Sequence, residues 1–481
     1  MNPPEGPSAD PPRLRLAIVG DTHYLNPAYH RGALGDAAGA PSNAPDITRH
    51  TWTTQEVLPQ LVAEVRAAAP DLVVHLGDVV QGHCDAAAGD AAELREAWEF
   101  FTALPRPLLF VRGTHEGRPG GPADAIYRDL FLTEVARTSG QVPATVTTNY
   151  ALVVGGIRVI ILDYTTFRPA GEAERLLVEQ LALAERRGEQ VVLCGHPPLI
   201  PVARPFFSRL DYAQGVLARL AASTAPTVYC CGHTHNQVAS LHRLSGERWL
   251  PQLQSVPLGY PDRAPLPLQH VRGLLPPPED LHYGWGYLED SAPGWILAEV
   301  EAHGLRLRWR RLGQQEDGGE VYLGLDGRAT FVHTPAEAPP VPPPAWPLQI
   351  GDARVRTVWL RAAGSASRAP HRLFLNDCAI GTLPRLEYFD ARQGLAIPPA
   401  CWPAITQQNV LRLEPVAEEE RSHCGFVIEV TLANGSVART RPLADIYTTS
   451  PKWDGWRWAA PSLRRVGQDE PLRLCLDFMG T

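Results

Sequence analysis

The chain has 481 residues, a formal net charge of −8 and 44% hydrophobic residues, which suits two or three globular domains and excludes global disorder. The acidic balance argues against a protein that binds nucleic acid through bulk electrostatics. The sequence has no run of about 18 apolar residues. Its Pro-rich start lacks a basic segment followed by an apolar one, so we expect neither a membrane span nor a secretory signal.

The eight cysteines form no CxxC pair and no short-spaced framework. In a chain of this length that pattern is typical of mostly buried, free thiols in a reducing compartment. We therefore expect a cytoplasmic protein.

Short apolar runs alternate with helical patterns from Leu14 to about Arg311, after a loose segment of residues 1–13. This alternation predicts an α/β layered domain. Gly155 and Gly156 join two apolar runs as a hairpin would, which makes the sheet mixed. The expected strands are Leu14–Val19, Leu72–Leu76, Leu108–Val111, Tyr150–Val154, Ile157–Leu162, Val191–Cys194 and Val228–Cys231. The expected helices are Thr51–Ala69, Ala91–Leu104, Glu172–Arg187 and Tyr212–Ala222.

The region that follows these elements is rich in proline, glycine and aromatic residues. Residues 251–293 show no clear period and are predicted to be long surface loops. Trp295–Glu301 and Leu305–Arg310 are predicted to form a closing hairpin. We place the first domain at residues 14–315 and a stiff Pro-rich linker at residues 316–347.

Beyond the linker the hydrophobic period changes to two, which predicts an all-β domain at residues 348–481, a β-sandwich or jelly roll. The expected strands are Arg354–Arg361, His371–Leu375, Asn409–Leu413, Phe426–Leu432 and Leu472–Phe478. Its many tryptophans favour core packing or a homo-oligomer formed through this domain over carbohydrate binding.

Five short segments concentrate Asp and His, and each follows an apolar run. They are Gly20–His23, Gly77–Asp78, Gly113–Glu116, Gly195–Pro198 and Gly232–His235. The carboxyl ends of strands in an open α/β sheet form the rim where ligands bind, so five strands can deliver these side chains to one place. A lone Asp-x-His or Gly-His is more often structural, whereas five such segments in this order indicate a functional site.

The types and number of these side chains predict a metal site. Imidazole and carboxylate together suit Mn, Fe, Zn or Co rather than Mg or Ca. The donors exceed what one catalytic ion keeps, and two ions about 3.5–4 Å apart accommodate the surplus. Asp78 is the natural shared ligand because its carboxylate has two oxygens. His83 and Cys84 follow it closely, and we expect them to support the site rather than bind the ions.

The series Asp-x-His, Gly-Asp, Gly-x-His-Glu, Gly-His and Gly-His-x-His resembles the pattern of the calcineurin-like metallophosphoesterases, and Pro70–Asp78 is similar to that family's second motif. The resemblance covers about Leu14 to Arg311 and implies a four-layer αββα domain with a dinuclear metal site that hydrolyses phosphate esters. It implies one ion on Asp21, His23, Asp78 and His235. It implies a second ion on Asp78, Thr114, His196 and His233. His115 would face the substrate phosphate.

Thr114 departs from the family pattern, which has Asn at this position. A hydroxyl on a short β-branched side chain reaches less far than an amide oxygen and is a poorer ligand. Three outcomes are open: Thr114 coordinates weakly, a water fills the gap, or the second ion is loosely held. We favour the water.

The expected mechanism follows from two adjacent cations. They lower the pKa of bound water, so that a hydroxide bridging them is a nucleophile near neutral pH, and they neutralise phosphate oxygens. His115 would stabilise the transition state or protonate the leaving group. Glu116 would either orient that ring or pair with an arginine.

Two long segments are candidate walls of the site. Residues 24–50 are longer than a typical connection and are expected to cover the metals, and residues 251–293 are the other candidate. Tyr24, Arg31, Tyr260 and His282 are the candidate substrate contacts. We expect a small-molecule phosphoester substrate, a phosphodiester or nucleotide. A binding or scaffold protein with weakened catalysis and a nuclease are the alternatives.

Overall fold

The structure is a computed structural model that divides the chain into two compact units, each described by itself. The N-terminal unit comprises residues 1–199, 211–270 and 281–335, and the C-terminal unit comprises residues 200–210, 271–280 and 336–481. The structure describes residues 12–31, 44–116, 121–140, 146–200, 210–233, 235, 237–245, 247–255, 269–271, 282–290, 293–314, 317–333, 347, 354–362, 366–367, 369–384, 394–418, 421–423, 426–433, 437–440, 446–449 and 463–478.

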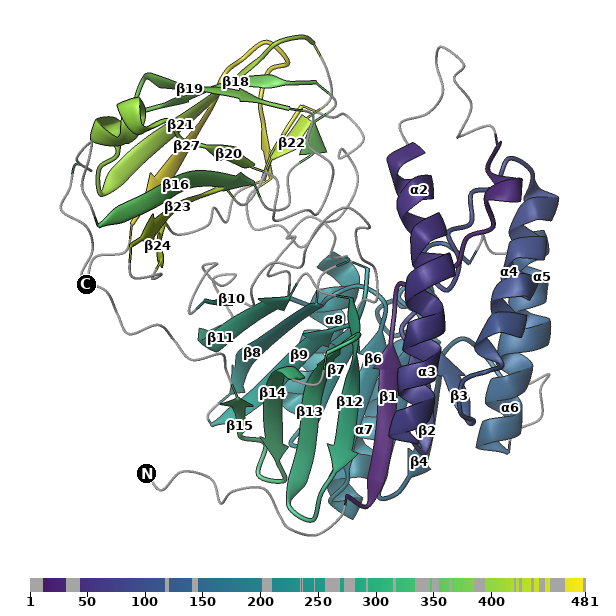
Figure 1. Ribbon diagram of the computed structural model, residues 1–481. Helices are drawn as coiled ribbons and strands as arrows, with labels where there is room; N and C mark the ends of the chain where they lie inside the picture. Colours follow the sequence, from purple (N-terminus) through teal and green to yellow (C-terminus); the bar gives the residue numbers. More distant parts are fainter. Residues whose placement is uncertain are drawn as a thin grey trace. The chain divides into compact units, whose positions relative to one another are not determined.

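Two mixed sheets form the centre of the N-terminal unit (Figure 1). The first sheet runs in the order β15 (Ala329–His333), β14 (Asp317–Gly324), β13 (Gly304–Arg311), β12 (Gly294–Val300), β1 (Leu14–Val19), β2 (Leu72–His75), β3 (Leu108–Phe110). The second runs in the order β10 (Gln269–Val271), β11 (His282–Asp290), β8 (Gln237–Ser245), β9 (Arg248–Gln254), β7 (Thr227–Cys231), β6 (Gln190–Gly195), β5 (Ile157–Leu162), β4 (Tyr150–Val154).

Helices cover the outer faces of both sheets, which gives the four layers of an αββα domain (Figure 1). Beside the first sheet lie α2 (Ala44–Trp52), the π-helical turn η2 (Thr53–Val57), α3 (Leu58–Ala68), α4 (Ala87–Phe101), α5 (Pro122–Ile126), the π-helical turn η3 (Tyr127–Leu132) and α6 (Thr133–Ser139). Beside the second lie α7 (Glu172–Arg187) and α8 (Leu210–Ala222).

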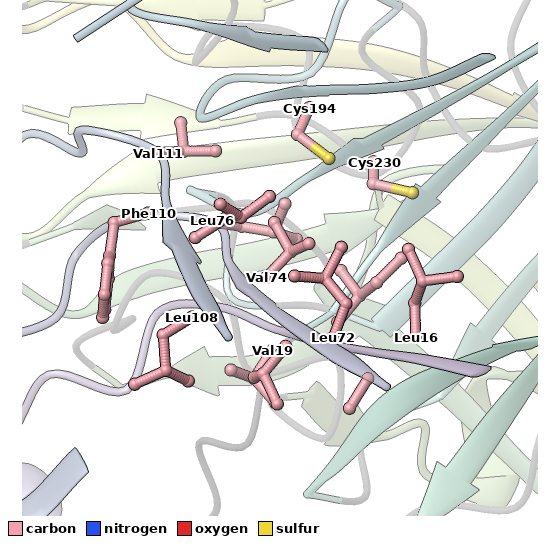
Figure 2. Packing of buried hydrophobic residues seen from close by; sticks show 14 of the residues in the cluster. Leu16, Val19, Leu72, Val74, Leu76, Leu108, Phe110, Val111, Cys194 and Cys230 are labelled. Atoms are coloured by element: carbon pink, nitrogen blue, oxygen red, sulfur yellow. The ribbon is translucent and has the colours of Figure 1, made fainter. Parts of the chain in front are cut away.

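The core lies between the two sheets, and the alternation of side chains along each strand explains it. Val192 and Cys194 of β6 join the cluster that also contains Leu16, Val74 and Phe110 of the first sheet (Figure 2). Leu193, which lies between them in β6, is also buried and points to the opposite face, where α7 lies. Because both faces are covered, these strands are continuous hydrophobic runs.

The elements expected between Leu14 and Cys231 are confirmed. The seven expected strands are β1 to β7, with bounds that differ by at most one residue at either end. The Gly155-Gly156 hairpin joins β4 to β5 as an antiparallel pair, and both glycines have positive φ angles of 55° and 86°. The expected helix at residues 51–69 begins earlier, because α2, η2 and α3 follow one another without a gap.

Two expectations about the later residues need correction. Residues 251–293 are not all loops: β9 continues to Gln254, and β10 and β11 add strands to the second sheet. The first sheet also continues beyond residue 315, since β14 and β15 pair with β13 and with each other at residues 317–333. In β14 glycine and charged residues interrupt the period-two pattern, and β15 has only five residues.

The C-terminal unit is built from β-strands, as its period of two predicts. One sheet runs β20 (Gly394–Ala396), β16 (Val355–Ala362), β23 (Phe426–Leu432), β24 (Val437–Arg439), and another runs β19 (Cys378–Leu383), β18 (His371–Leu375), β21 (Gln408–Pro415), β27 (Leu472–Asp477). A third contains β17 (Ala366–Ser367), β22 (Arg421–His423), β25 (Ile446–Thr448), β26 (Leu463–Arg465). Alternate residues of the first two sheets form one hydrophobic core, which is the arrangement of a sandwich.

The described cysteines are free, and Cys194, Cys230, Cys231 and Cys401 are buried. Among the described residues, no helix combines the length and the apolar character needed to cross a membrane.

His242 on β8 predicts a pH dependence of stability. Its side chain is 1% exposed and burial lowers its pKa to about 3. The unfolded chain therefore binds a proton below about pH 6.5 that the folded chain does not, so stability falls as the pH drops through this range by about 1.4 kcal/mol per unit. We expect His242→Gln to reduce the slope of the unfolding free energy against pH, between pH 6 and 4.5, by the amount that one bound proton contributes. Urea denaturation at several pH values measures this slope. The same change at the exposed His303 should leave the slope unaltered, and an unchanged slope in His242→Gln would contradict this account.

Candidate metal centre

The predicted ligands lie just past the carboxyl ends of parallel strands. Asp21 and His23 follow β1, and Asp78 follows β2, its parallel neighbour. In the second sheet His196 follows β6, and the segment with His233 and His235 follows β7, which is parallel to β6. Because the carboxyl ends of parallel strands meet at one edge, all these side chains come together, as the sequence predicts.

The donor atoms form two clusters that share one carboxylate. Within each, the ligating atoms lie within 4.8 Å of one another, close to the span of two ligands on one ion with bonds of about 2.0–2.2 Å. The first cluster is Asp21, His23, Asp78 and His235, and the second is Asp78, His196 and His233. These are the two ligand sets implied by the family resemblance, apart from Thr114.

The backbone at the ligands is held in an unusual conformation. Asp21, His23, Asp78, His233 and His235 have φ angles of 45°, 42°, 51°, 72° and 54°, in a region that costs non-glycine residues of order 1–3 kcal/mol each and that concentrates at functional sites. Neighbouring glycines leave the space for this crowding. A Cβ on Gly232 would collide with the Asp21 carboxylate, and one on Gly113 would collide with Asp78.

Carbonyl oxygens fix the proton on the outer ring nitrogen of two ligands. His196 Nδ1 lies 2.9 Å from the carbonyl oxygen of Leu76, and His23 Nδ1 lies 2.8 Å from Gln81 Oε1. An oxygen of this kind only accepts, so each Nδ1 donates and each Nε2 turns inward. His196 Nε2 is 3.1 Å and His23 Nε2 is 3.7 Å from Asp78 Oδ2. Such outer partners orient metal-binding histidines in proteins.

The charges at the site are arranged for a cation. Burial lowers the pKa of His196, but Asp78 and other carboxylates outweigh it and raise that pKa to about 10. Burial likewise raises the pKa of Asp78, and the neighbouring histidines, His196 foremost, bring it well below its ordinary value. A proton on His196 thus neutralises the shared carboxylate, and metal binding would displace that proton. The buried donors, imidazole and carboxylate, fit borderline divalent ions.

Thr114, His115 and Glu116 follow β3 and reach the centre in different ways. Thr114 N and His115 N donate to Asp78 Oδ1 at 2.6 and 2.9 Å, and the Thr114 hydroxyl donates to the same carboxylate at 3.1 Å. The His115 ring lies 4.7 Å from that of His23. Glu116 Oε1 accepts from Val79 N and its Oε2 from Gly113 N. Glu116 therefore ties together the loops that carry Asp78 and Thr114, and within the described part of the chain its carboxylate bonds to these backbone amides rather than to the His115 ring or an arginine.

Arg49 and His50, at the end of the segment expected to cover the site, were not singled out from the sequence. Arg49 Nη2 lies 3.3 Å from His235 Nδ1 and 3.4 Å from His50 Nε2. The His50 ring stacks on His23 at 4.6 Å, and its buried Nδ1 has no hydrogen-bond partner among the described residues. The adjacent Arg-His pair inside a helical pattern was the available signal, but such pairs are common on solvated helix faces.

The structure places the four candidate substrate residues in different surroundings. Tyr24 is half-buried, pairs with Val80 and packs on the ring of Phe100, so its described contacts are those of a packing residue. Arg31 is exposed. His282 begins β11, and its side chain lies outside the described part. Tyr260 lies wholly outside the described residues.

Residues 14–237 match the model of the calcineurin-like phosphoesterase family. Over this segment the chain is similar to the calcineurin-like phosphoesterases. The family and the two donor clusters together support a metal-dependent phosphoesterase, which is a hydrolase.

Solved structures similar to the chain include PhoD, with 12% identity, 69% of this chain and 73% of that chain covered, and a TM-score of 0.42. A dimetal phosphatase from Danio rerio has 14% identity, covers 64% of this chain and 98% of its own, and has a TM-score of 0.39. At these identities the likeness concerns the fold alone. A search of curated proteins found no match.

Thr114 gives a prediction about metal affinity. Its hydroxyl is held by Asp78, whereas an Asn amide oxygen at this position reaches further and is a better ligand. We expect Thr114→Asn to tighten the weaker of two bound ions by about 10-fold, as measured by Mn²⁺ titration calorimetry. Thr114→Val, which removes the hydroxyl and keeps the shape, is the control. Two equally tight ions in the unmodified protein would contradict the prediction.

Proposed function

We propose that the chain hydrolyses phosphodiesters or nucleotides with a dinuclear metal centre. The observation that carries this proposal is the pair of donor clusters that share Asp78. A carboxylate common to two sets of ligands is the arrangement that holds two ions about 3.5–4 Å apart. Donors of this mixed kind favour manganese, iron, zinc or cobalt.

When bound, two such ions supply Lewis-acid charge for phosphate oxygens and lower the pKa of water. The chain's own residues position this chemistry. Asp78 is fixed by the amides of Thr114 and His115, and His23 and His196 are fixed through their outer nitrogens. Because these side chains are held in place before the substrate binds, the site does not need to reorganise during the reaction.

His115 is the proposed group that holds or donates a proton at the leaving oxygen. Its Nδ1 makes a short contact with the carbonyl oxygen of Gln81, so Nδ1 donates there and Nε2 is the nitrogen left for the substrate. The half-buried ring can therefore present one defined nitrogen. This supports a role in proton transfer at Nε2.

Arg49 supports the choice of a diester. Its guanidinium contacts a ligand of the clusters, since Arg49 Nη2 lies 3.3 Å from His235 Nδ1. A guanidinium binds phosphate oxygens in a planar, directional way. A phosphomonoester approaches two negative charges at neutral pH, and a diester carries less. A diester therefore needs less positive charge beside the ions.

A comparison of two chromogenic esters tests the proposal. With Mn²⁺ supplied, we expect turnover of bis(p-nitrophenyl) phosphate to exceed that of p-nitrophenyl phosphate by about 10-fold or more. The reverse preference would contradict the diester assignment. Two bound ions with no turnover across a wider phosphoester and nucleotide panel would contradict catalysis and favour a binding or scaffold role.

A further inference from the structure

A third group of metal-ligating side chains lies in the N-terminal unit, outside the two clusters that share Asp78. His30, Cys84 and Glu93 bring their ligating atoms within 4.8 Å of one another. His30 follows the short helix η1 (Pro27–Tyr29), Cys84 lies in the loop after Asp78, and Glu93 lies on α4. His30 is 1% and Glu93 0% exposed, and Cys84 is half-buried.

Two of the three distances within this group are close to those between ligands of a four-coordinate ion. Cys84 Sγ lies 3.6 Å from His30 Nε2 and 3.8 Å from Glu93 Oε2. Two ligands at a tetrahedral angle on zinc are separated by roughly 3.3–3.6 Å, given the bond lengths that zinc makes with S, N and O. The third distance, 2.8 Å between His30 Nε2 and Glu93 Oε1, is a hydrogen bond whose proton an ion would replace.

Backbone amides hold Glu93 in place independently of the other two side chains. Asn26 N donates to Glu93 Oε1 at 3.0 Å, and Gly82 N donates to Oε2 at 2.9 Å. Each carboxylate oxygen has two lone pairs, so Oε2 retains one directed acceptor position. The ligand is thus oriented before an ion binds, as in established metal sites.

The surroundings of the group are negative. Asp90 Oδ1 accepts from Cys84 N at 2.8 Å, and Glu96 accepts from the Tyr29 hydroxyl at 2.6 Å. Burial, Glu93 and Asp90 raise the pKa of the Cys84 thiol. A hydrogen bond to Glu96 raises the pKa of Tyr29 to about 12. A cation relieves this excess of negative charge.

We propose that His30, Cys84 and Glu93 bind a single zinc ion at a third site, separate from the dinuclear centre. The thiolate selects a borderline-soft ion over Mg²⁺ or Mn²⁺. Three protein ligands leave a fourth position for water on the half-exposed side of Cys84. Binding releases the Cys84 thiol proton to solvent, so affinity rises with pH, and the His30 ring binds through Nε2 as a neutral imidazole with its proton on Nδ1.

Zinc at this site would stiffen the loop that supports the active-site histidines. Gly82, whose amide is bonded to Glu93, follows Gln81 directly. Gln81 holds the outer nitrogens of His23 and His115 through its side chain and its carbonyl oxygen. The third site therefore joins η1, this loop and α4, and it does so whether or not the protein turns over a phosphoester.

Cobalt substitution tests the proposal on the full chain. No cysteine belongs to the two shared clusters, so a thiolate-to-cobalt charge-transfer absorption reports the third site. We expect this band in the unmodified protein, in Asp78→Asn, and in Cys475→Ser, which removes an exposed cysteine. We expect it to vanish in Cys84→Ser and to require at least about 10-fold more Co²⁺ in His30→Gln.

A measurement on the unmodified protein removes any dependence on how the variants fold. Equimolar Zn²⁺ added after the dinuclear centre is filled with Mn²⁺ should protect Cys84, and not Cys475, from alkylation, as followed by peptide mass spectrometry. Absence of both the cobalt band and zinc protection would show a hydrogen-bonded network only and would overturn the proposal. A band that persists in Cys84→Ser would overturn it as well. Neither readout depends on hydrolysis, so the test remains valid even if the protein hydrolyses none of the phosphoesters tried.

Discussion

Asp78→Asn is expected to lower phosphodiester turnover by at least about 1000-fold and to reduce the metal held by the two clusters that share Asp78 from two ions to one or fewer. Asp78 belongs to both donor clusters, so its charge serves two ions at once. Asn keeps an oxygen that can accept from Thr114 N and His115 N, and the loops therefore stay in place. What is lost is the second ligating oxygen and the negative charge.

Metal content after dialysis and steady-state kinetics measure this effect together. Asp163→Asn is the matched control, because Asp163 also follows a strand and is fully buried but accepts from Thr148 and Thr165 and belongs to neither cluster. We expect Asp163→Asn to retain both ions at the clusters that share Asp78. Two tightly bound ions and undiminished turnover in Asp78→Asn would refute the shared-ligand arrangement.

His115→Ala is expected to have the second large effect, and the effect depends on the leaving group. A positioned acid contributes about 100- to 10,000-fold where the leaving oxygen needs a proton. Alkyl diesters should therefore lose activity by at least about 100-fold. Nitrophenyl esters, whose leaving group departs as a stable anion, should lose far less.

The measurement is the slope of log kcat/KM against leaving-group pKa, which should become steeper in His115→Ala. His83→Ala is the control, since its exposed ring lies 5.0 Å from that of His115 and is not among the cluster ligands. Equal losses on good and poor leaving groups would reject an acid and leave His115 with a binding role.

The strands and the ligands were accessible from the sequence for one reason. A buried parallel strand is a short continuous apolar run, and its end is marked where glycine and polar residues begin. Asp21, Asp78 and His196 each stand at such an end, so the topology of parallel strands converts their positions along the chain into proximity. Strands with a weaker pattern, such as β14 and β15, gave no comparable signal.

The sequence by itself thus determined the two-part organisation, the layered α/β core and the set of donors that form the two clusters sharing Asp78. Only the tertiary structure decided that Arg49 and His50 lie against those donors, that Glu116 bonds to backbone amides, and that His30, Cys84 and Glu93 meet elsewhere in the same unit. The physical reason is that these contacts depend on how helices and loops pack on the sheet, and packing between distant segments leaves no period in the sequence.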